Sequence, residues 1–209
     1  MLASGKSRVA ERTIARKLPV QERSRRTVEA ILDAAARLFV ERGYAATTTN
    51  HVAEAAGVSV GSLYQYFPSK DALVVALDLR HLDRAEARLR DELAALRRDL
   101  PPPNEWARRV VHVLVAINES DLDRLLYRLA PPVSEVERRV GQLARLMARD
   151  TATHFERFGA PPALARTRAR IAVVSALALV HEVVIQARPG AARRQAEAEV
   201  VRLLAALAA

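Results

Sequence analysis

Apolar residues recur at intervals of three and four positions along most of this chain, and no segment alternates apolar and polar residues with a period of two. Such spacing places apolar side chains on one face of an α-helix and leaves no candidate for a β-strand. Clusters of proline and glycine separate the periodic segments, as is typical of helix ends. The sequence therefore predicts an all-α protein of about nine helices. Their expected ranges are 27–42, 49–56, 60–67, 69–100, 104–118, 121–129, 134–158, 163–187 and 191–208.

The character of these helices changes near residue 80, from short segments with frequent turns to long amphipathic ones. The change predicts one domain over residues 25–80 and a second over residues 81–209. A basic, flexible arm of residues 1–24 is expected to precede them, because residues 1–26 carry eight Lys or Arg and two Glu side chains. A segment of this charge is typical of an arm that binds a polyanion, and a solvated leader is the alternative.

Composition and motif content exclude several kinds of site. The chain has no cysteine, which excludes disulfides and thiolate metal sites. The segment HEVVI at 181–185 lacks the second histidine of the H-E-x-x-H zinc motif, and no glycine-rich phosphate loop is present. We therefore expect no metal and no cofactor. The longest apolar stretch, 171–185, is too short to cross a bilayer, and the first residues lack a signal-peptide core. These features predict a cytoplasmic protein without a membrane partner.

The segment GVSVG at residues 57–61 matches the G-x-S-x-G motif of serine hydrolases. That motif requires a strand of a parallel sheet before the serine, whereas the residues before Gly57 have helical spacing. In a helix-turn-helix, by contrast, Gly57 permits the positive φ of the turn, Val58 fills the angle between the helices and Ser59 caps the second helix. The outward side of residues 60–66 then shows tyrosine, glutamine and serine without a carboxylate, which suits anionic DNA. We interpret Ser59 as a cap and expect no catalytic residue.

The run AATTTNHVAEAAGVSVGSLYQYFPSKDAL at residues 45–73 combines a threonine doublet, an A-G-V-S turn, an L-Y-x-Y-F core and an F-P-S-K-D-A-L entry to the next helix. Together these motifs resemble the DNA-binding domain of the TetR family of transcriptional repressors, over about Arg25 to Leu79. The rest of the chain resembles the family only in length and helical layout. The resemblance implies an N-terminal three-helix domain with a helix-turn-helix, followed by a C-terminal helical bundle for ligand binding and dimerisation.

The resemblance also implies DNA contacts, position by position. Phosphate contacts are expected from Thr49, Tyr64, Tyr66 and Lys70. Base edges are expected to be read from Asn50 and from the second helix of the motif, where Gln65 can pair bidentately with adenine. The complete set of expected DNA-binding residues is Thr48, Thr49, Asn50, Val60, Gly61, Ser62, Tyr64, Gln65, Tyr66 and Lys70.

Two positions depart from the family pattern. Val60 stands where a lysine or arginine is frequent, which removes a charged contact. His51 stands where an acidic residue often completes the capping box, which predicts a weaker cap. Because residues 27–75 carry more acidic than basic side chains, the affinity for DNA is expected to depend strongly on the basic arm.

As the resemblance implies, residues 81–209 are expected to supply a dimer interface and a ligand pocket. Helices 163–187 and 191–208 are the predicted dimer faces, with a buried core of a monomer as the alternative. The pocket is sought where polar groups lie on apolar helix faces, and a carboxylate such as Glu182 is costly to bury unless it is paired. For Trp106 and His154 a role in the core is the alternative. The expected ligand-binding residues are Trp106, Asn118, Tyr127, Met147, His154, Glu182 and Gln186.

Taken together, these features predict a homodimeric transcriptional regulator. It would bind a palindromic operator in double-stranded DNA as a repressor and would be released by a small-molecule inducer. One alternative is a constitutive helical DNA-binding protein without an inducer. A helical enzyme is a more distant alternative.

Overall fold

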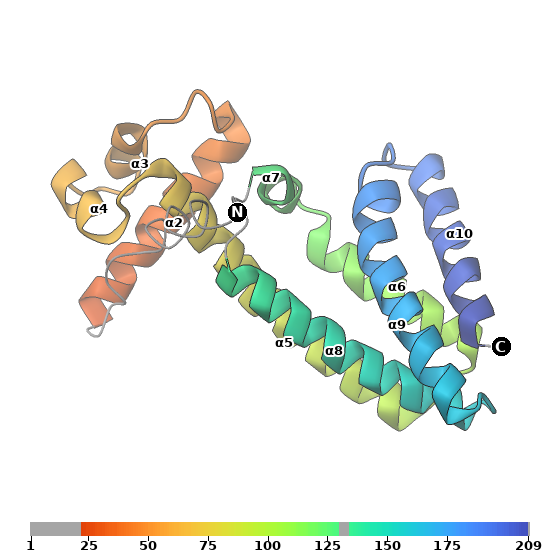
Figure 1. Ribbon diagram of the computed structural model, residues 1–209. Helices are drawn as coiled ribbons and strands as arrows, with labels where there is room; N and C mark the ends of the chain where they lie inside the picture. Colours follow the sequence, from red (N-terminus) through yellow and green to blue (C-terminus); the bar gives the residue numbers. More distant parts are fainter. Residues whose placement is uncertain (1–21, 130–133, 209) are drawn as a thin grey trace, which may run out of the picture. The chain divides into compact units, whose positions relative to one another are not determined.

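The computed structural model describes residues 22–129 and 134–208, and these residues form nine α-helices, one π-helical segment and no strand (Figure 1). The predicted all-α fold class is confirmed. In chain order the elements are α2 (Glu22–Arg42), α3 (Thr49–Ala55), α4 (Val60–Tyr66), α5 (Lys70–Asp99), α6 (Pro103–Asn118), α7 (Asp121–Leu129), α8 (Ser134–Arg157), α9 (Pro162–Leu179), the π-helical segment η1 (Val180–Ile185) and α10 (Ala191–Ala208). None of the described helices has the length and hydrophobicity that a membrane span requires.

Helix α2 begins at Glu22, five residues before its predicted start. Glu22 forms an ion pair with Arg26 at 3.3 Å, and its negative charge in the first turn interacts favourably with the helix dipole. Residues 22–24 of the predicted arm are therefore helical. The remaining arm residues, 1–21, lie outside the described residues.

The predicted helix 163–187 consists of two parts, α9 and the π-helical segment η1. Four of the six residues of η1 are valine or isoleucine. These β-branched side chains have little χ1 freedom in a regular α-helix, and η1 is a local departure from that geometry.

The described chain divides into two compact units. The first contains residues 22–82 together with 121–129 and 134–137, and the second contains residues 83–120 and 138–208. Helix α5 thus contributes to both units, with Lys70–Leu82 in the first. Helix α7 packs against α2, although the sequence places it in the domain of residues 81–209. The boundary near residue 80 stays a prediction.

The core of the first unit is formed where α2, α3, α4 and the start of α5 converge. Phe39 and Phe67 are its largest fully buried side chains. Val52 and Leu63 are also fully buried, and the smaller residues between them pack against the same cluster. From α7, Leu126 adds a further buried side chain.

In the second unit, α9 packs through a face of small side chains. The buried residues of this face are Ala165, Ala169, Ala172, Val173 and Ala176. Alanine permits close approach of neighbouring helices, and α9 contacts both α6 and α10. Ion pairs join α5 to α8, with Arg139 contacting Asp83 at 2.8 Å and Glu86 at 3.0 Å. Helix α5 ends at Asp99, and the next residue, Leu100, has a φ of +42° in the left-handed region, just before three prolines.

Candidate DNA-binding surface

Helix α3 begins with a complete capping box. The hydroxyl of Thr48 accepts a hydrogen bond from the backbone N–H of His51 at 3.2 Å, and the Nδ1 of His51 accepts one from the backbone N–H of Thr48 at 3.4 Å. A neutral imidazole nitrogen thus takes the place of the usual carboxylate acceptor. His51 was expected to weaken this capping box, yet both hydrogen bonds of the box are present. They orient the first turn of α3, which carries Thr49 and Asn50.

The turn between α3 and α4 has the geometry expected of a helix-turn-helix. Gly57 adopts a φ of +67°, which L side chains rarely adopt. The backbone N–H of Val58 then donates to the carbonyl of Ala53 at 3.0 Å and closes the turn. The hydroxyl of Ser59 accepts from the backbone N–H of Ser62 at 3.0 Å. Ser59 is therefore the N-cap of α4, as predicted.

The outer face of α4 is open to solvent. Val60 and Tyr64 are 38% and 43% exposed, and Gly61 and Gln65 are exposed as well. Ser62 is half-buried, with its hydroxyl 2.8 Å from that of Ser59. No residue of α4 carries a carboxylate. This face can therefore approach a polyanion without charge repulsion from its own helix.

Tyr66 differs from the outward orientation expected for it. Its side chain is half-buried and packs against the core cluster of the first unit. The reason is helical spacing, because residue 66 lies one position before the buried Phe67 and three after the buried Leu63, at the edge of the inner face.

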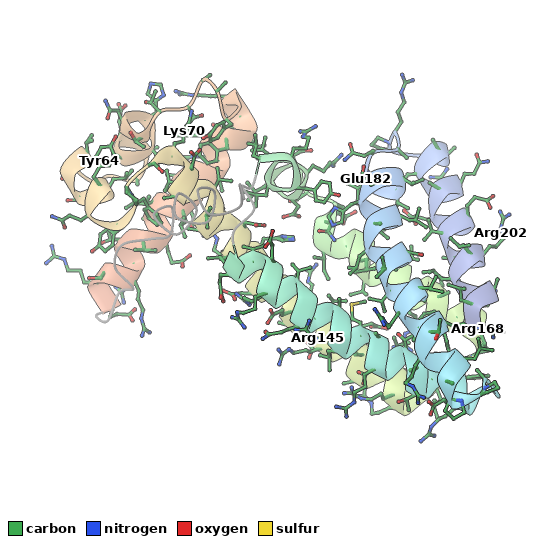
Figure 2. The ribbon with its side chains drawn as sticks, viewed as in Figure 1. Tyr64, Lys70, Arg145, Arg168, Glu182 and Arg202 are labelled. Carbon is green, nitrogen blue, oxygen red and sulfur yellow. The ribbon has the colours of Figure 1, made fainter. Side chains whose placement is uncertain are left out.

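The hydroxyls of Thr49 and Tyr64 lie 2.9 Å apart and join α3 to α4 (Figure 2). The structure thus brings together two residues that were expected to contact phosphate. One hydroxyl donates its proton to the other, so one proton of the pair remains for an external acceptor. A phosphate oxygen is such an acceptor.

Lys70, at the start of α5, forms contacts that the sequence did not predict (Figure 2). Its ammonium donates to the carbonyl of Tyr44 at 2.7 Å and to the carbonyl of Thr47 at 2.8 Å, and lies 4.1 Å from the centre of the Tyr44 ring. Two of its three donors are thereby used within the protein. Lys70 therefore clamps the loop between α2 and α3 and keeps one donor, and its expected contact with phosphate stays a prediction.

Tyr44 and Asp71 complete this clamp, and neither was identified from the sequence. The Tyr44 hydroxyl donates to the Asp71 carboxylate. Burial, together with this hydrogen bond and the nearby negative charge, raises the pKa of Tyr44 to about 12, so the phenol stays protonated at neutral pH. The fully buried Thr47 donates to the carbonyl of Gly43 at 2.9 Å. The clamp fixes the loop that leads into α3.

In the second unit, two of the predicted ligand residues lie together. The rings of Trp106 and His154 are stacked with centroids 5.8 Å apart, and both line a cavity of about 120 Å³. The Nε2 atom of His154 is buried and has no hydrogen-bond partner among the described residues. Burial lowers the pKa of His154. The cavity is therefore lined by an imidazole whose buried nitrogen forms no hydrogen bond within the described residues.

The other predicted ligand residues do not line this cavity. Met147 is buried in the core of the second unit, and the amide of Asn118 donates to the carbonyl of Leu114 at 2.7 Å. Glu182, in η1, and Gln186, which follows it, are exposed, because the inner side of η1 is formed by Val180, Val184 and Ile185.

Tyr127 lies on α7 in the first unit and is 47% exposed, whereas Trp106 and His154 belong to the second unit. Its expected role in ligand binding stays a prediction.

Replacing His154 by phenylalanine should reduce the acid sensitivity of the protein. A lowered pKa in the folded state means that, below an unfolded pKa of about 6.5, the unfolded chain binds a proton that the folded chain does not. The stability that His154 contributes is then present above this pH and is lost as the pH falls, by at most about 1.4 kcal/mol per pH unit. Chemical denaturation between about pH 7 and pH 5 measures the effect.

The matched control for this experiment is His112→Gln, at an exposed position of α6. We expect this variant to retain the acid dependence of the wild type. Equal acid dependence of the wild type and His154→Phe would show that His154 does not titrate differently in the folded and unfolded states.

Comparison with known proteins identifies the first unit. Residues 31–77 match the family model for bacterial regulatory proteins of the tetR family. The transcriptional repressor KstR2 of Rhodococcus jostii is 43% identical over 65 residues, which cover 31% of this chain and 32% of the repressor. The regulator YvkB of Bacillus subtilis is 41% identical over 76 residues, which cover 36% of this chain and 40% of that protein. The chain thus matches about a third of the length of these relatives.

Similarity to solved structures extends over most of the chain. The ketosteroid transcriptional regulator KstR2 of Mycobacterium tuberculosis is 26% identical with a TM-score of 0.56, over 91% of this chain and 97% of its own. A TetR-family regulator from Streptomyces coelicolor is 25% identical with a TM-score of 0.56, over 87% of this chain and 96% of its own. These proteins are transcriptional regulators, so the similarity is to DNA-binding proteins and not to enzymes.

Proposed function

Because residues 31–77 form a DNA-binding domain of the tetR family of bacterial regulatory proteins, we propose that this chain is a repressor that binds a palindromic operator as a homodimer and is released by a small molecule. The observation that carries this proposal is the outer face of α4, which is exposed and free of carboxylates and lies beside the capped first turn of α3. A helix of this kind fits the major groove of DNA.

The proposed DNA contacts divide into two kinds. Thr49 and Tyr64 bind phosphate through their paired hydroxyls, and this contact positions the domain without reading sequence. Asn50, Gln65 and the remaining exposed positions of α4 read base edges. Gln65 is the strongest candidate, because its amide can donate to and accept from adenine.

We assign the dimer interface to helices 163–187 and 191–208, the region of α9, η1 and α10. Ile171, Val174 and Val183 are 49%, 65% and 44% exposed, and Leu203 on α10 is 48% exposed. Exposed apolar side chains on neighbouring helices favour burial against another surface. A second copy that presents the same face covers them in a two-fold symmetric contact. Such a dimer suits operator half-sites about 34–36 Å apart or a multiple of this distance.

We assign the inducer site to the cavity at Trp106 and His154. The free Nε2 of His154 calls for a ligand that completes a hydrogen bond. The cavity, at about 120 Å³, is smaller than usual ligand pockets, so a ligand must displace the side chains that line it. Leu93, Leu96 and Leu100 are among these side chains and lie at the far end of α5.

The position of these leucines suggests how the ligand acts on DNA binding. Helix α5 is continuous from Lys70 to Asp99 and belongs to both compact units. A ligand that moves its far end therefore acts on the helix whose first residues clamp the loop before α3. Release from DNA follows only if the ligand binds the DNA-free arrangement more tightly than the DNA-bound one.

Selection of bound sequences from a random DNA library tests the proposed function directly. We expect the wild-type chain to enrich a palindrome with two half-sites. A sequence without two-fold symmetry would contradict the dimeric arrangement, and failure to enrich any sequence would contradict specific DNA binding. Ligand screening by thermal shift, followed by release from the enriched operator, then tests the inducer.

Two substitutions on α4 should separate positioning from base recognition. Tyr64→Phe removes a hydroxyl from the Thr49–Tyr64 pair and should weaken binding to all operator variants about equally. Gln65→Ala should cost about 1–3 kcal/mol at one operator position and relax the base preference there. Binding to a set of single-base operator variants measures both effects. If Gln65→Ala weakened binding to every variant equally, Gln65 would be a positioning residue.

A further inference from the structure

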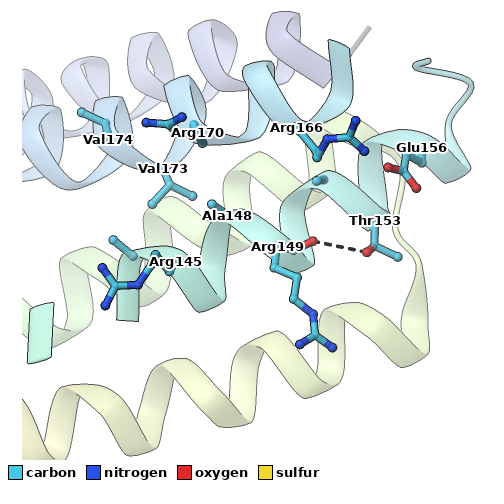
Figure 3. Close-up of a pocket in the computed structure, with 11 residues that line it drawn as sticks. Arg145, Ala148, Arg149, Thr153, Glu156, Arg166, Arg170, Val173 and Val174 are labelled. Carbon is cyan, nitrogen blue, oxygen red and sulfur yellow. Dashed lines mark hydrogen bonds between the residues drawn. The ribbon is translucent and has the colours of Figure 1, made fainter. Parts of the chain in front are cut away.

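A groove of about 450 Å³ lies between α8 and α9 in the second unit (Figure 3). Its apolar surface comes from small side chains: Ala144, Ala148 and Ala152 follow one another at four-residue spacing along α8, and Val173 and Val174 come from α9. Four-residue spacing places the three alanines on one face of α8. The groove has the volume of a small-molecule site.

Four arginines line the groove with a single carboxylate. They are Arg145 and Arg149 on α8 and Arg166 and Arg170 on α9, and the carboxylate is Glu156. In Figure 3 the side chains of Arg166 and Arg170 lie along α9, while Arg149 extends away from α9. The groove therefore combines an apolar surface with a strong excess of positive charge.

These four arginines differ from others in the same unit. Arg109 is paired with Glu92 at 2.6 Å and with Asp99 at 2.7 Å, and Arg139 likewise contacts two carboxylates. Within the described residues, none of the four groove arginines forms an ion pair. Their positive charge is thus available to an anion from outside this chain. Guanidinium groups bind carboxylate and related oxyanions through two parallel hydrogen bonds.

The groove is separate from the cavity at Trp106 and His154. The two are lined by different sides of α8 and share only Thr153. A molecule in the groove would therefore contact the opposite side of the same helix.

We propose that this groove is a second small-molecule site, for an amphipathic organic anion. Arg166 and Arg170 bind its oxyanion, and its apolar part covers Ala148, Ala152 and Val173. The charge excess favours an anion over a neutral molecule or a cation, and the apolar surface favours a hydrocarbon body over a fully hydrophilic anion. The proposal does not rest on DNA binding, but the groove shares Val174 with the dimer face assigned above, so its test also measures dimerisation.

Isothermal titration calorimetry with dodecanoate tests the proposal, with dodecyltrimethylammonium as the probe of opposite charge. Loss of two partly exposed charge contacts in Arg166→Gln/Arg170→Gln should raise the Kd for dodecanoate about tenfold. Ala148→Leu, which narrows the groove without changing its charge, should also weaken binding. The matched control is Arg188→Gln/Arg194→Gln, which removes two exposed arginines outside the groove and should leave the Kd unchanged. The cationic probe should not bind.

Three results would overturn the proposal. Dodecanoate affinity that is equal in all variants, or matched by the cationic probe, would show non-specific binding. Loss of binding in His154→Phe but not in the groove variants would place dodecanoate in the Trp106 cavity. Absence of dodecanoate binding, together with weaker dimerisation of Arg166→Gln/Arg170→Gln in sedimentation, would mean that a second copy of the chain covers the groove. Far-ultraviolet circular dichroism verifies that each variant is folded.

Discussion

Removal of residues 1–21 is expected to weaken binding to duplex DNA strongly and to make it much less sensitive to salt. These residues carry five Lys or Arg and one Glu, and they precede α2, which begins at Glu22. Each phosphate that a basic side chain neutralises contributes about −0.9 to the slope of log K against log salt. If all five contact DNA, the slope becomes shallower by about 4.5. Fluorescence anisotropy over a series of salt concentrations measures the slope.

A chain of full length with glutamine in place of the five basic residues is the matched control. It retains the length of the arm and removes only its positive charge. We expect the same shallow slope from this variant as from the truncation. If the truncated chain and the glutamine variant both kept the wild-type slope, the arm would not contact DNA and would be only a solvated leader.

Phe67→Ala is expected to lower the stability of the first unit by about 3–5 kcal/mol. Phe67 closes α4 and is fully buried in the core of that unit, so alanine leaves a cavity that its neighbours fill only in part. Such a loss is comparable with the entire stability of a small domain. We therefore expect Phe67→Ala to bind DNA poorly at temperatures at which the wild type binds well.

The single tryptophan allows this effect to be located. Trp106 lies in the core of the second unit, so its fluorescence reports on that unit, whereas circular dichroism reports on all helices. During urea denaturation of Phe67→Ala, circular dichroism should show an early transition that tryptophan fluorescence lacks. The control is Val40→Ala on α2, at a side chain that is 45% exposed, where little change is expected. An equal early shift in both signals would show that the two units unfold as one.

The helix caps and the turn between α3 and α4 were predicted from the sequence, because they depend on residues close together in the chain. Thr48 and Ser59 cap α3 and α4 through hydrogen bonds to residues three positions away. The positive φ of Gly57 is a property of one residue in a tight turn. The burial of Leu63 and Phe67 likewise follows from local spacing, because a short helix with one apolar side has only one way to face a core.

Features that involve distant residues were not predicted. Lys70 was assigned to phosphate from its place in a motif, yet its ammonium contacts carbonyls that lie 23 and 26 positions earlier. Tyr44 and Asp71 are 27 positions apart, and no local pattern relates them. The arginine groove depends on the pairing of α8 with α9, which spacing within either helix does not reveal.

Sequence by itself determined the helical fold class, the helix-turn-helix and the composition of the outer face of α4, because caps, turns and periodicity act within a few residues. Only the tertiary structure decided which side of α9 is buried. The predicted helix 163–187 is apolar around most of its circumference, so its pattern did not distinguish the buried side of α9 and η1 from the side that carries Glu182. Close approach to α6 and α10 favours the smaller side chains, which turns Glu182 and Gln186 outward and leaves Trp106 and His154 to form the cavity.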